Sequence, residues 1–200
     1  TAGLAFGGDP STAVTEEFTS GASPFAAWSS GGNLPGSNRA SMGTAGTQTA
    51  GLSFGGKNGT PAPSITDEYN GSSWTNSGNM NTGRSYLAGT GTQTAALACP
   101  GYPTNLPNGT ATEEYNGSSW TAGGNMGTAK KYLAGCGLQT AALLFGGQTP
   151  SITNVTQEYN GTAWTNGGNL NTAREKLSGF GIQTAAAACG GESPPVTGAT

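Results

Sequence analysis

The sequence has 200 residues, of which only 8% are charged, a formal net charge of −3 and no histidine. So few basic residues argue against binding to nucleic acid or to an anionic membrane surface, because both need clustered Lys and Arg. The commonest general base and metal ligand is absent, and no segment reaches the ~18 apolar residues of a membrane span. We therefore expect no catalytic residue, metal site or cofactor, no nucleic-acid partner and no membrane insertion.

An internal repeat dominates the chain, and such a period must be identified before any single motif is interpreted. The segment TAGLSFGG at 49–56 recurs with small changes at intervals of 48, 45, 46 and 44 residues. We therefore expect one repeat domain over 1–200. Its approximate repeats are 1–48, 49–93, 94–139, 140–183 and a partial fifth repeat, 184–200.

The elements of each repeat follow one another in a fixed order. The apolar strand that ends in Gly-Gly, at 1–8 in the first repeat, is followed by a variable stretch. An acidic-aromatic strand comes next and in the later repeats ends in Asn-Gly, the dipeptide favoured where a hairpin turn needs positive φ at both central residues. A Trp-containing strand, a basic residue and a small-residue strand then lead into the next copy. Four short antiparallel strands in ~45 residues are typical of one propeller blade.

The small-residue strand, LAGTG at 87–91 or LSGFG at 177–181, suits the innermost position, where blades crowd the axis. The other apolar runs are nearly continuous, which is typical of a sheet buried on both faces. The expected fold is thus an all-β propeller of four-stranded antiparallel blades. A Gly-Gly pair that closes an apolar strand, followed by an aromatic residue, a Trp and a basic residue, resembles the Kelch motif. The wording TQTAALxFGG, EEYNGSSWT and GNxNTAR also resembles repeat regions of bacteriophage tail or fibre proteins, especially marine ones.

The strand count leaves the closure of the ring open. The chain holds five copies of the strand that ends in Gly-Gly and four copies of each other strand. If the strand around Leu177 pairs with the N-terminal strand around Leu4, four blades close and residues 184–200 are left over. Alternatively, the blades are part of a larger ring or of a ring shared between chains, because open strand edges invite pairing.

Residues that recur in every repeat are expected to be structural. The repeated glutamates are expected to pair with the repeated basic residues or to accept backbone N–H bonds between blades, and the tryptophans to form the core between blades. The alternatives are paired carboxylates of a glycosidase and a set of sugar-stacking platforms. The residues are Glu17, Glu68, Glu114 and Glu158; Arg39, Arg84, Lys130 and Arg174; and Trp28, Trp74, Trp120 and Trp164.

The repeats differ most after Gly-Gly, at 57–64, 102–109 and 148–154. These segments join the second and third strands of each blade, so all should emerge on one face, and loops held by a rigid scaffold are where binding residues gather. The alternative is that they vary because nothing constrains them. The candidate ligand-binding residues are Asp9, Lys57, Asn58, Tyr102, Asn105, Asn108, Gln148 and Asn154.

Three functions remain open at this stage. The first is a non-catalytic binding or adhesion module, of the phage-fibre type or otherwise extracellular, that contacts a cell-surface glycan or protein; its expected location is extracellular or on a virion. The second is a structural spacer that contacts other copies of itself or other virion proteins. The third is a carbohydrate-active enzyme, which needs carboxylates that do not recur in every blade, such as Asp9, Glu175 and Glu192.

Overall fold

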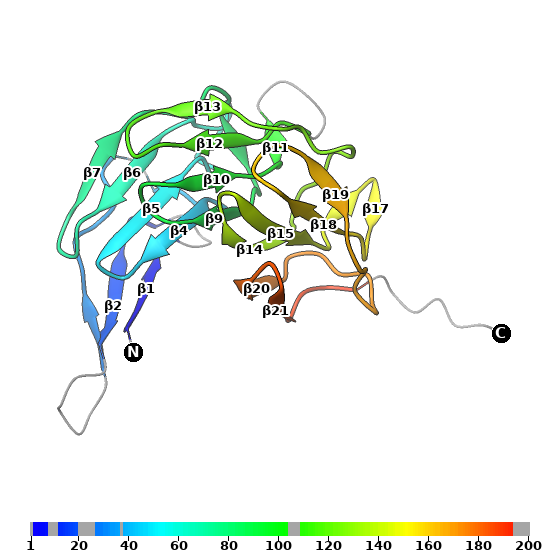
Figure 1. The fold of residues 1–200 in the computed structure, drawn as a ribbon. Helices are drawn as coiled ribbons and strands as arrows, with labels where there is room; N and C mark the ends of the chain where they lie inside the picture. Colours follow the sequence, from blue (N-terminus) through cyan, green and yellow to red (C-terminus); the bar gives the residue numbers. More distant parts are fainter. Residues whose placement is uncertain (1, 8–11, 20–26, 37, 104–108, 194–200) are drawn as a thin grey trace.

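The computed structural model describes residues 2–7, 12–19, 27–36, 38–103 and 109–193. Within these ranges every regular element is a β-strand, and the strands form antiparallel sheets (Figure 1). The same ranges contain no helix that is long and apolar enough to span a membrane. The all-β expectation is therefore confirmed.

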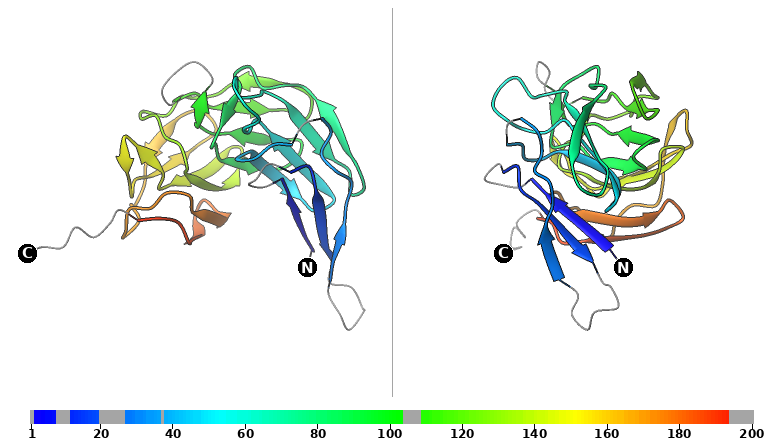
Figure 2. Two further views of the ribbon diagram at one scale, coloured as in Figure 1. Left: turned by 180° about the vertical axis from the view of Figure 1, so that it is seen from behind. Right: turned by 90° about the vertical axis from the view of Figure 1, so that its left-hand side faces the viewer.

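Five sheets follow one another along an arc (Figure 2). We number them from the N-terminus and list the strands of each sheet in their spatial order. The first sheet is β1 (Ala2–Phe6), β2 (Thr15–Thr19) and β3 (Ala27–Ser30). The second is β4 (Gly43–Thr47), β5 (Ala50–Phe54), β6 (Thr66–Tyr69) and β7 (Trp74–Ser77). The third is β9 (Gly89–Gly91), β10 (Ala96–Ala98), β12 (Glu113–Tyr115) and β13 (Trp120–Ala122). The fourth is β14 (Ala134–Leu138), β15 (Ala141–Phe145), β18 (Thr156–Tyr159) and β19 (Trp164–Asn166). The fifth is β20 (Ser178–Ile182) and β21 (Ala185–Cys189).

Two small ribbons lie outside these sheets. They are β8 (Arg84–Ser85) with β11 (Tyr102–Pro103), and β16 (Gln148–Thr149) with β17 (Ser151–Ile152). In the first ribbon, β8 lies just before β9, and β11 lies at the start of the variable segment 102–109. The ribbon therefore holds the start of this segment beside the chain that leads into β9.

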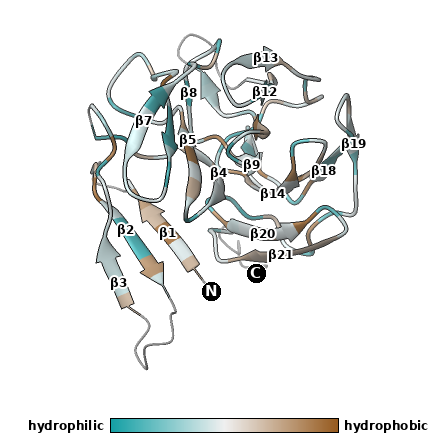
Figure 3. Ribbon diagram, turned by 60° about the vertical axis from the view of Figure 1, so that its left-hand side comes forward, coloured by the Kyte–Doolittle hydropathy of each residue, from teal (hydrophilic) through white to brown (hydrophobic). Residues whose placement is uncertain are grey.

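The small-residue strands are innermost, as the sequence predicts. Strands β4, β9, β14 and β20 lie side by side around one axis (Figure 3). Their glycines are needed because the strands crowd one another: a Cβ on Gly89 would lie 2.4 Å from the carbonyl oxygen of Thr44. A Cβ on Gly135 would lie 2.6 Å from Leu144 and 3.0 Å from Thr90.

The apolar core lies between consecutive sheets. Phe54 of the second sheet packs edge-on against Trp120 of the third, with ring centroids 4.9 Å apart. Phe6 and Trp74 make the same contact one sheet earlier, at 4.7 Å. The burial of β5 and β10 is nearly continuous, which confirms that these sheets are covered on both faces.

The arc is not closed, and the first of the two alternatives for the ring, in which the Leu177 strand pairs with the Leu4 strand, is not formed. In the part of the chain that the structure describes, β20 pairs with β21, with Ser178 opposite Cys189, and no strand pairing joins β20 to β1. The β20–β21 hairpin is favoured because its connection is only a few residues long. Its formation therefore costs less loop-closure entropy than a pairing between the two ends of the chain.

The turn after the acidic-aromatic strand also differs from the expected two-residue hairpin. Between Tyr69 and Trp74 the chain forms a four-residue loop in which Gly71 has a φ of +92°, whereas Asn70 is not among the positive-φ residues. The Asn70 side-chain oxygen instead accepts the backbone N–H groups of Ser72 and Ser73, at 3.0 and 2.9 Å. Asn is favoured here as a side-chain acceptor, as in an Asx turn.

Candidate functional site

The scaffold that carries the site is a set of contacts repeated between neighbouring sheets. The indole N–H of each buried or partly buried Trp donates to the hydroxyl of a Thr on the preceding sheet. The pairs are Trp74 with Thr15 at 3.0 Å, Trp120 with Thr66 at 2.9 Å and Trp164 with Thr112 at 3.1 Å. Trp28, on the outer strand of the first sheet, is 54% exposed and packs on Phe18 of its own sheet.

The repeated glutamates accept hydrogen bonds from tyrosine hydroxyls of the following sheet. Tyr69 donates to Glu17, Tyr115 to Glu68 and Tyr159 to Glu114. Burial and the bond to Glu68 raise the pKa of Tyr115 to about 12. Glu158 belongs to the fourth sheet, and the fifth sheet as described has only the two strands β20 and β21.

Two of the basic residues pair with the other member of an acidic pair, which corrects the expected partners. Arg39 forms a buried ion pair with Asp67, and Arg84 forms one with Glu113. Side-chain direction alternates along a strand, so adjacent acidic residues face opposite sides of the sheet. In the pairs Asp67-Glu68 and Glu113-Glu114, the first carboxylate therefore meets the cation and the second meets the tyrosine.

The junction between the third and fourth sheets is built differently. Lys130 is 1% exposed, and its ammonium group donates to the carbonyl oxygen of Val155 at 3.2 Å. The position of the acid is taken by Gln157, whose side-chain oxygen has no partner among the described residues. Burial lowers the pKa of Lys130 to about 8. In the next repeat, Arg174 donates to the carbonyl oxygen of Gly190 at 3.2 Å.

One end of the axis carries an unusual backbone feature, which we call the collar. Its four residues occupy equivalent positions, two residues after each repeated basic residue, and have φ values of +53° to +58°: Ser41, Tyr86, Tyr132 and Lys176. Left-handed backbone at a bulky non-glycine residue is uncommon and costs of order 1–3 kcal/mol. Such conformations cluster at functional sites.

The collar residues are joined to one another around the axis by backbone hydrogen bonds. Tyr86 N–H donates to the Ser41 carbonyl at 3.0 Å, and Tyr132 N–H donates to the Tyr86 carbonyl at 3.1 Å. Lys176 N–H donates to the Tyr132 carbonyl at 2.8 Å. Because of the positive φ, the segment that precedes each inner strand forms a backbone hydrogen bond to the equivalent segment of the neighbouring repeat.

A second arc, which we call the rim, is formed by the first residue after each Gly-Gly position. Lys57 pairs through its backbone with Ala40, Tyr102 with Ser85, Gln148 with Lys131, and Glu192 with Glu175. Each partner immediately precedes a collar residue. Three of the predicted ligand-binding residues, Lys57, Tyr102 and Gln148, are therefore brought to one end of the axis.

The side chains of collar and rim form one cluster of aromatic rings and ammonium groups. The rings of Tyr86 and Tyr132 lie 4.6 Å apart. The ammonium group of Lys131 lies 5.1 Å from the Tyr132 ring and 5.5 Å from the Tyr102 ring. That of Lys57 lies 6.0 Å from the Tyr86 ring. These three separations are within the range of cation–π attraction.

Two hollows open at this cluster. One, of about 220 Å³, lies between Lys57 and Tyr102 and is also lined by Thr60 and Tyr86. The other, of about 250 Å³, lies on the collar between Tyr86, Tyr132 and Lys176. Burial and the neighbouring Tyr86 raise the pKa of Tyr132. The Tyr132 hydroxyl therefore stays protonated and can donate a hydrogen bond at neutral pH.

Acidic and basic side chains are unevenly distributed over the cluster. Lys176 forms a 3.0 Å ion pair with Glu192, which raises the pKa of Lys176. Glu175 is buried, and one of its carboxylate oxygens has no hydrogen-bond partner among the described residues. The acidic side chains thus gather at the C-terminal end of the arc, while Lys57, Tyr102 and Lys131 occupy the rest.

The other predicted ligand-binding residues lie outside the cluster or outside the described residues. Asn58 is exposed beside Lys57. The Asn154 side chain donates to the carbonyl oxygen of Leu170 at 3.0 Å, which is a bond within its own repeat. Asp9, Asn105 and Asn108 lie outside the described residues. The described residues contain no group of three or more Cys, Asp or Glu side chains that could hold a metal ion.

The collar was not among the functional positions expected from the sequence. Each position lies two residues after the repeated basic residue and is followed by Met or Leu, while its own residue type is Ser, Tyr or Lys. Comparison of the repeats at that position would have shown this divergence. The left-handed backbone itself was not visible, because Tyr and Lys do not favour it.

Comparison with known proteins supports the fold. No protein-family model and no curated protein matches the chain. Among solved structures, the one titled "Structure of YjhT", a β-propeller, aligns with a TM-score of 0.75 and 11% sequence identity over 88% of this chain. The chain spans 66% of the length of that structure. The described part of the chain is therefore a propeller-like array of antiparallel sheets that is similar in fold to YjhT.

Proposed function

We propose that this chain is a non-catalytic binding module on a Kelch-like repeat propeller, of an extracellular or virion recognition type. Its ligand, a cell-surface glycan or protein, docks on the collar and rim. The observation that carries the proposal is that these positions combine one repeated backbone with four different sets of side chains. Residues that only maintain the scaffold, such as Trp120 and Tyr115, recur from sheet to sheet instead.

The chemistry of the cluster favours a glycan over an apolar ligand. Tyr rings offer flat apolar faces with a hydroxyl at the edge, and the ammonium groups of Lys57 and Lys131 supply several hydrogen-bond donors. The hollow of about 220 Å³ between Lys57 and Tyr102 is close to the lower limit of small-molecule pockets, about 300 Å³. A short or branched saccharide that spreads over both hollows fits this surface better than one deeply enclosed ligand.

The proposal is tested by binding of the purified chain to a glycan array and to intact cells. Tyr102→Ala combined with Lys131→Ala removes the aromatic face and its ammonium group from the middle of the cluster. Thr165→Ala, on the exposed outer strand β19, is the matched control. We expect the double variant to lose at least about tenfold in affinity while the control binds as the parent does.

Equal binding by both variants would remove the collar and rim from the site. If the folded parent binds nothing on the array or on cells, the structural-spacer function takes its place. In that case, light scattering should show that the chain associates with itself.

A further inference from the structure

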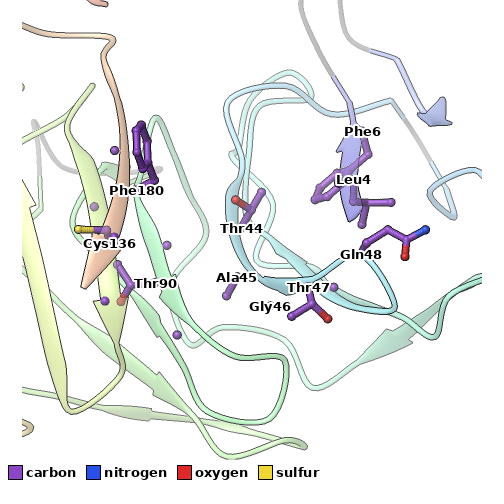
Figure 4. Close-up of a pocket in the computed structure, with 18 of the residues that line it drawn as sticks. Leu4, Phe6, Thr44, Ala45, Gly46, Thr47, Gln48, Thr90, Cys136 and Phe180 are labelled. Atoms are coloured by element: carbon purple, nitrogen blue, oxygen red, sulfur yellow. The ribbon is translucent and has the colours of Figure 1, made fainter. Parts of the chain in front are cut away.

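A cavity of about 400 Å³ lies on the axis, away from the collar (Figure 4). The inner strands run from the collar toward their hairpin turns, and the cavity is lined along their length and by β1. Four side chains at equivalent positions, each followed by a glycine with positive φ, contribute to its wall: Ala45, Thr90, Cys136 and Phe180. Because these four differ while the glycines recur, the cavity wall varies between repeats in the same way as the collar.

The wall offers hydrogen bonds without charge. Its lining residues include no Asp, Glu, Lys or Arg. Each inner strand pairs within its sheet on one side only, so the backbone N–H and C=O groups of its other edge are not used by that sheet. Gln48 and Thr47 add polar side chains near the open flank.

One buried polar group in the wall points to a ligand. Thr90 is 4% exposed, and its hydroxyl has no hydrogen-bond partner among the described residues. A buried hydroxyl without a partner costs about 1–3 kcal/mol. The neighbouring wall positions hold the methyl group of Ala45 and the thiol of Cys136, so a molecule in the cavity that reaches this hydroxyl would supply its missing partner.

The same wall has an exposed aromatic face. The ring of Phe180 is 62% exposed and lies on the same side of the cavity as Cys136 and Thr90, whereas Leu4 and Gln48 lie on the other side (Figure 4). An exposed aromatic face beside uncharged hydrogen-bonding groups matches a ligand with one apolar face and several hydroxyl groups. A charged ligand would lose its hydration there without finding a counter-ion.

We propose that this axial cavity is a second binding site, specific for a neutral sugar unit or a polyol of similar size. In this arrangement Phe180 stacks on the C–H face of the ring, and Thr90 and the backbone edges of β4 and β9 bind its hydroxyl groups. The site shares no side chain with the cluster formed by Tyr102 and Lys131. It can therefore be tested whether or not that cluster binds a glycan.

Cys136 provides a direct reporter of occupancy. Burial raises the pKa of its thiol, so alkylation by iodoacetamide is followed at about pH 9, where part of the thiol is ionised. The exposed Cys189 is replaced by Ser to remove the competing reaction, and the fully buried Cys99 serves as the unreactive reference. A panel of glucose, galactose, mannose, N-acetylglucosamine and glucuronate is added at increasing concentration, and alkylation of Cys136 is measured by mass spectrometry.

We expect at least one neutral sugar to slow the alkylation of Cys136 about threefold or more at saturation, and glucuronate to have no effect. Phe180→Ala should weaken this protection about fivefold. Thr90→Val, which keeps the shape of the side chain, should weaken it by a similar factor. Tyr102→Ala combined with Lys131→Ala should leave it unchanged, which separates this site from the cluster at the collar.

The proposal fails if no neutral sugar in the panel protects Cys136, and the cavity is then a solvent channel. It also fails if glucuronate protects as well as the neutral sugars do, or if Phe180→Ala leaves protection intact. Loss of protection in the Tyr102 and Lys131 double variant would place the sugar at the collar instead. Circular dichroism of each variant identifies any loss that comes from unfolding.

Discussion

Two junctions, between the second and third sheets and between the third and fourth sheets, each bury a basic residue, but with different partners. Where the second sheet meets the third, Arg84 and Glu113 form a buried ion pair. Where the third meets the fourth, Lys130 donates to a backbone carbonyl beside the uncharged Gln157. Both junctions keep the Trp–Thr and Tyr–Glu contacts. The comparison indicates that these shared contacts hold neighbouring sheets together, and that the ion pair is dispensable where its acid is also replaced.

The largest expected effect comes from removing one partner of the ion pair. Arg84→Met leaves Glu113 buried without its cation and should lower the free energy of unfolding by about 3–5 kcal/mol. Lys130→Met leaves no carboxylate behind and should change it far less, or raise it. Urea denaturation of both variants measures the difference. Equal losses in the two variants would show that the junctions depend on their cations in the same way.

A smaller effect is expected in the pH dependence of stability. The pKa of Lys130 is lowered from 10.5 to about 8 in the folded chain, so between these pH values the unfolded chain binds more protons. The contribution of Lys130 to the free energy of unfolding should therefore increase as the pH rises from about 8 toward 10, by at most about 1.4 kcal/mol per pH unit. It is measured as the difference between the parent and Lys130→Met, because buried tyrosines and cysteines also titrate at high pH.

Gln157→Glu sharpens this test. The new carboxylate should restore the pairing seen at the other junctions and raise the pKa of Lys130. We then expect the pH-dependent difference between pH 8 and 10 to disappear. If the slope is the same in the parent and in the Gln157→Glu variant, Lys130 is not its source.

The smallest expected effect concerns the contacts that both junctions share. Trp120→Phe removes the hydrogen bond to Thr66 and some packing, and should cost about 1–2 kcal/mol. Trp28→Phe, at a half-exposed position on the first sheet, should change stability by less than about 0.5 kcal/mol. Thermal unfolding of the two variants tests this contrast. A comparable cost for Trp28→Phe would mean that another surface covers this residue in solution.

The sequence predicted the parts of the fold that depend on pattern. The repeated apolar strands, the innermost small-residue strands and the convergence of Lys57, Tyr102 and Gln148 on one end of the axis follow from order and spacing. The sequence did not predict which acidic residue pairs with each cation, because two adjacent acidic residues differ only in the side of the strand to which their side chains point. The collar could not be predicted, since its left-handed backbone is imposed by bonds between repeats rather than by the propensities of Tyr86 or Lys176. The sequence left the closure of the ring open, because a short local hairpin competes with a pairing across the chain.

The collar has a consequence for how such a chain can change over time. Each collar position is supplied by a different repeat in the same backbone conformation, and other segments of the repeats, such as TAGLSFGG at 49–56 and TAALLFGG at 140–147, are nearly identical in sequence. Such similar segments are the substrate for unequal recombination within a gene. An exchange, gain or loss of one whole repeat would therefore reorder the side chains around the axis without the remodelling of a single loop. The recognition surface can be shuffled in whole units, in addition to its evolution by point substitution.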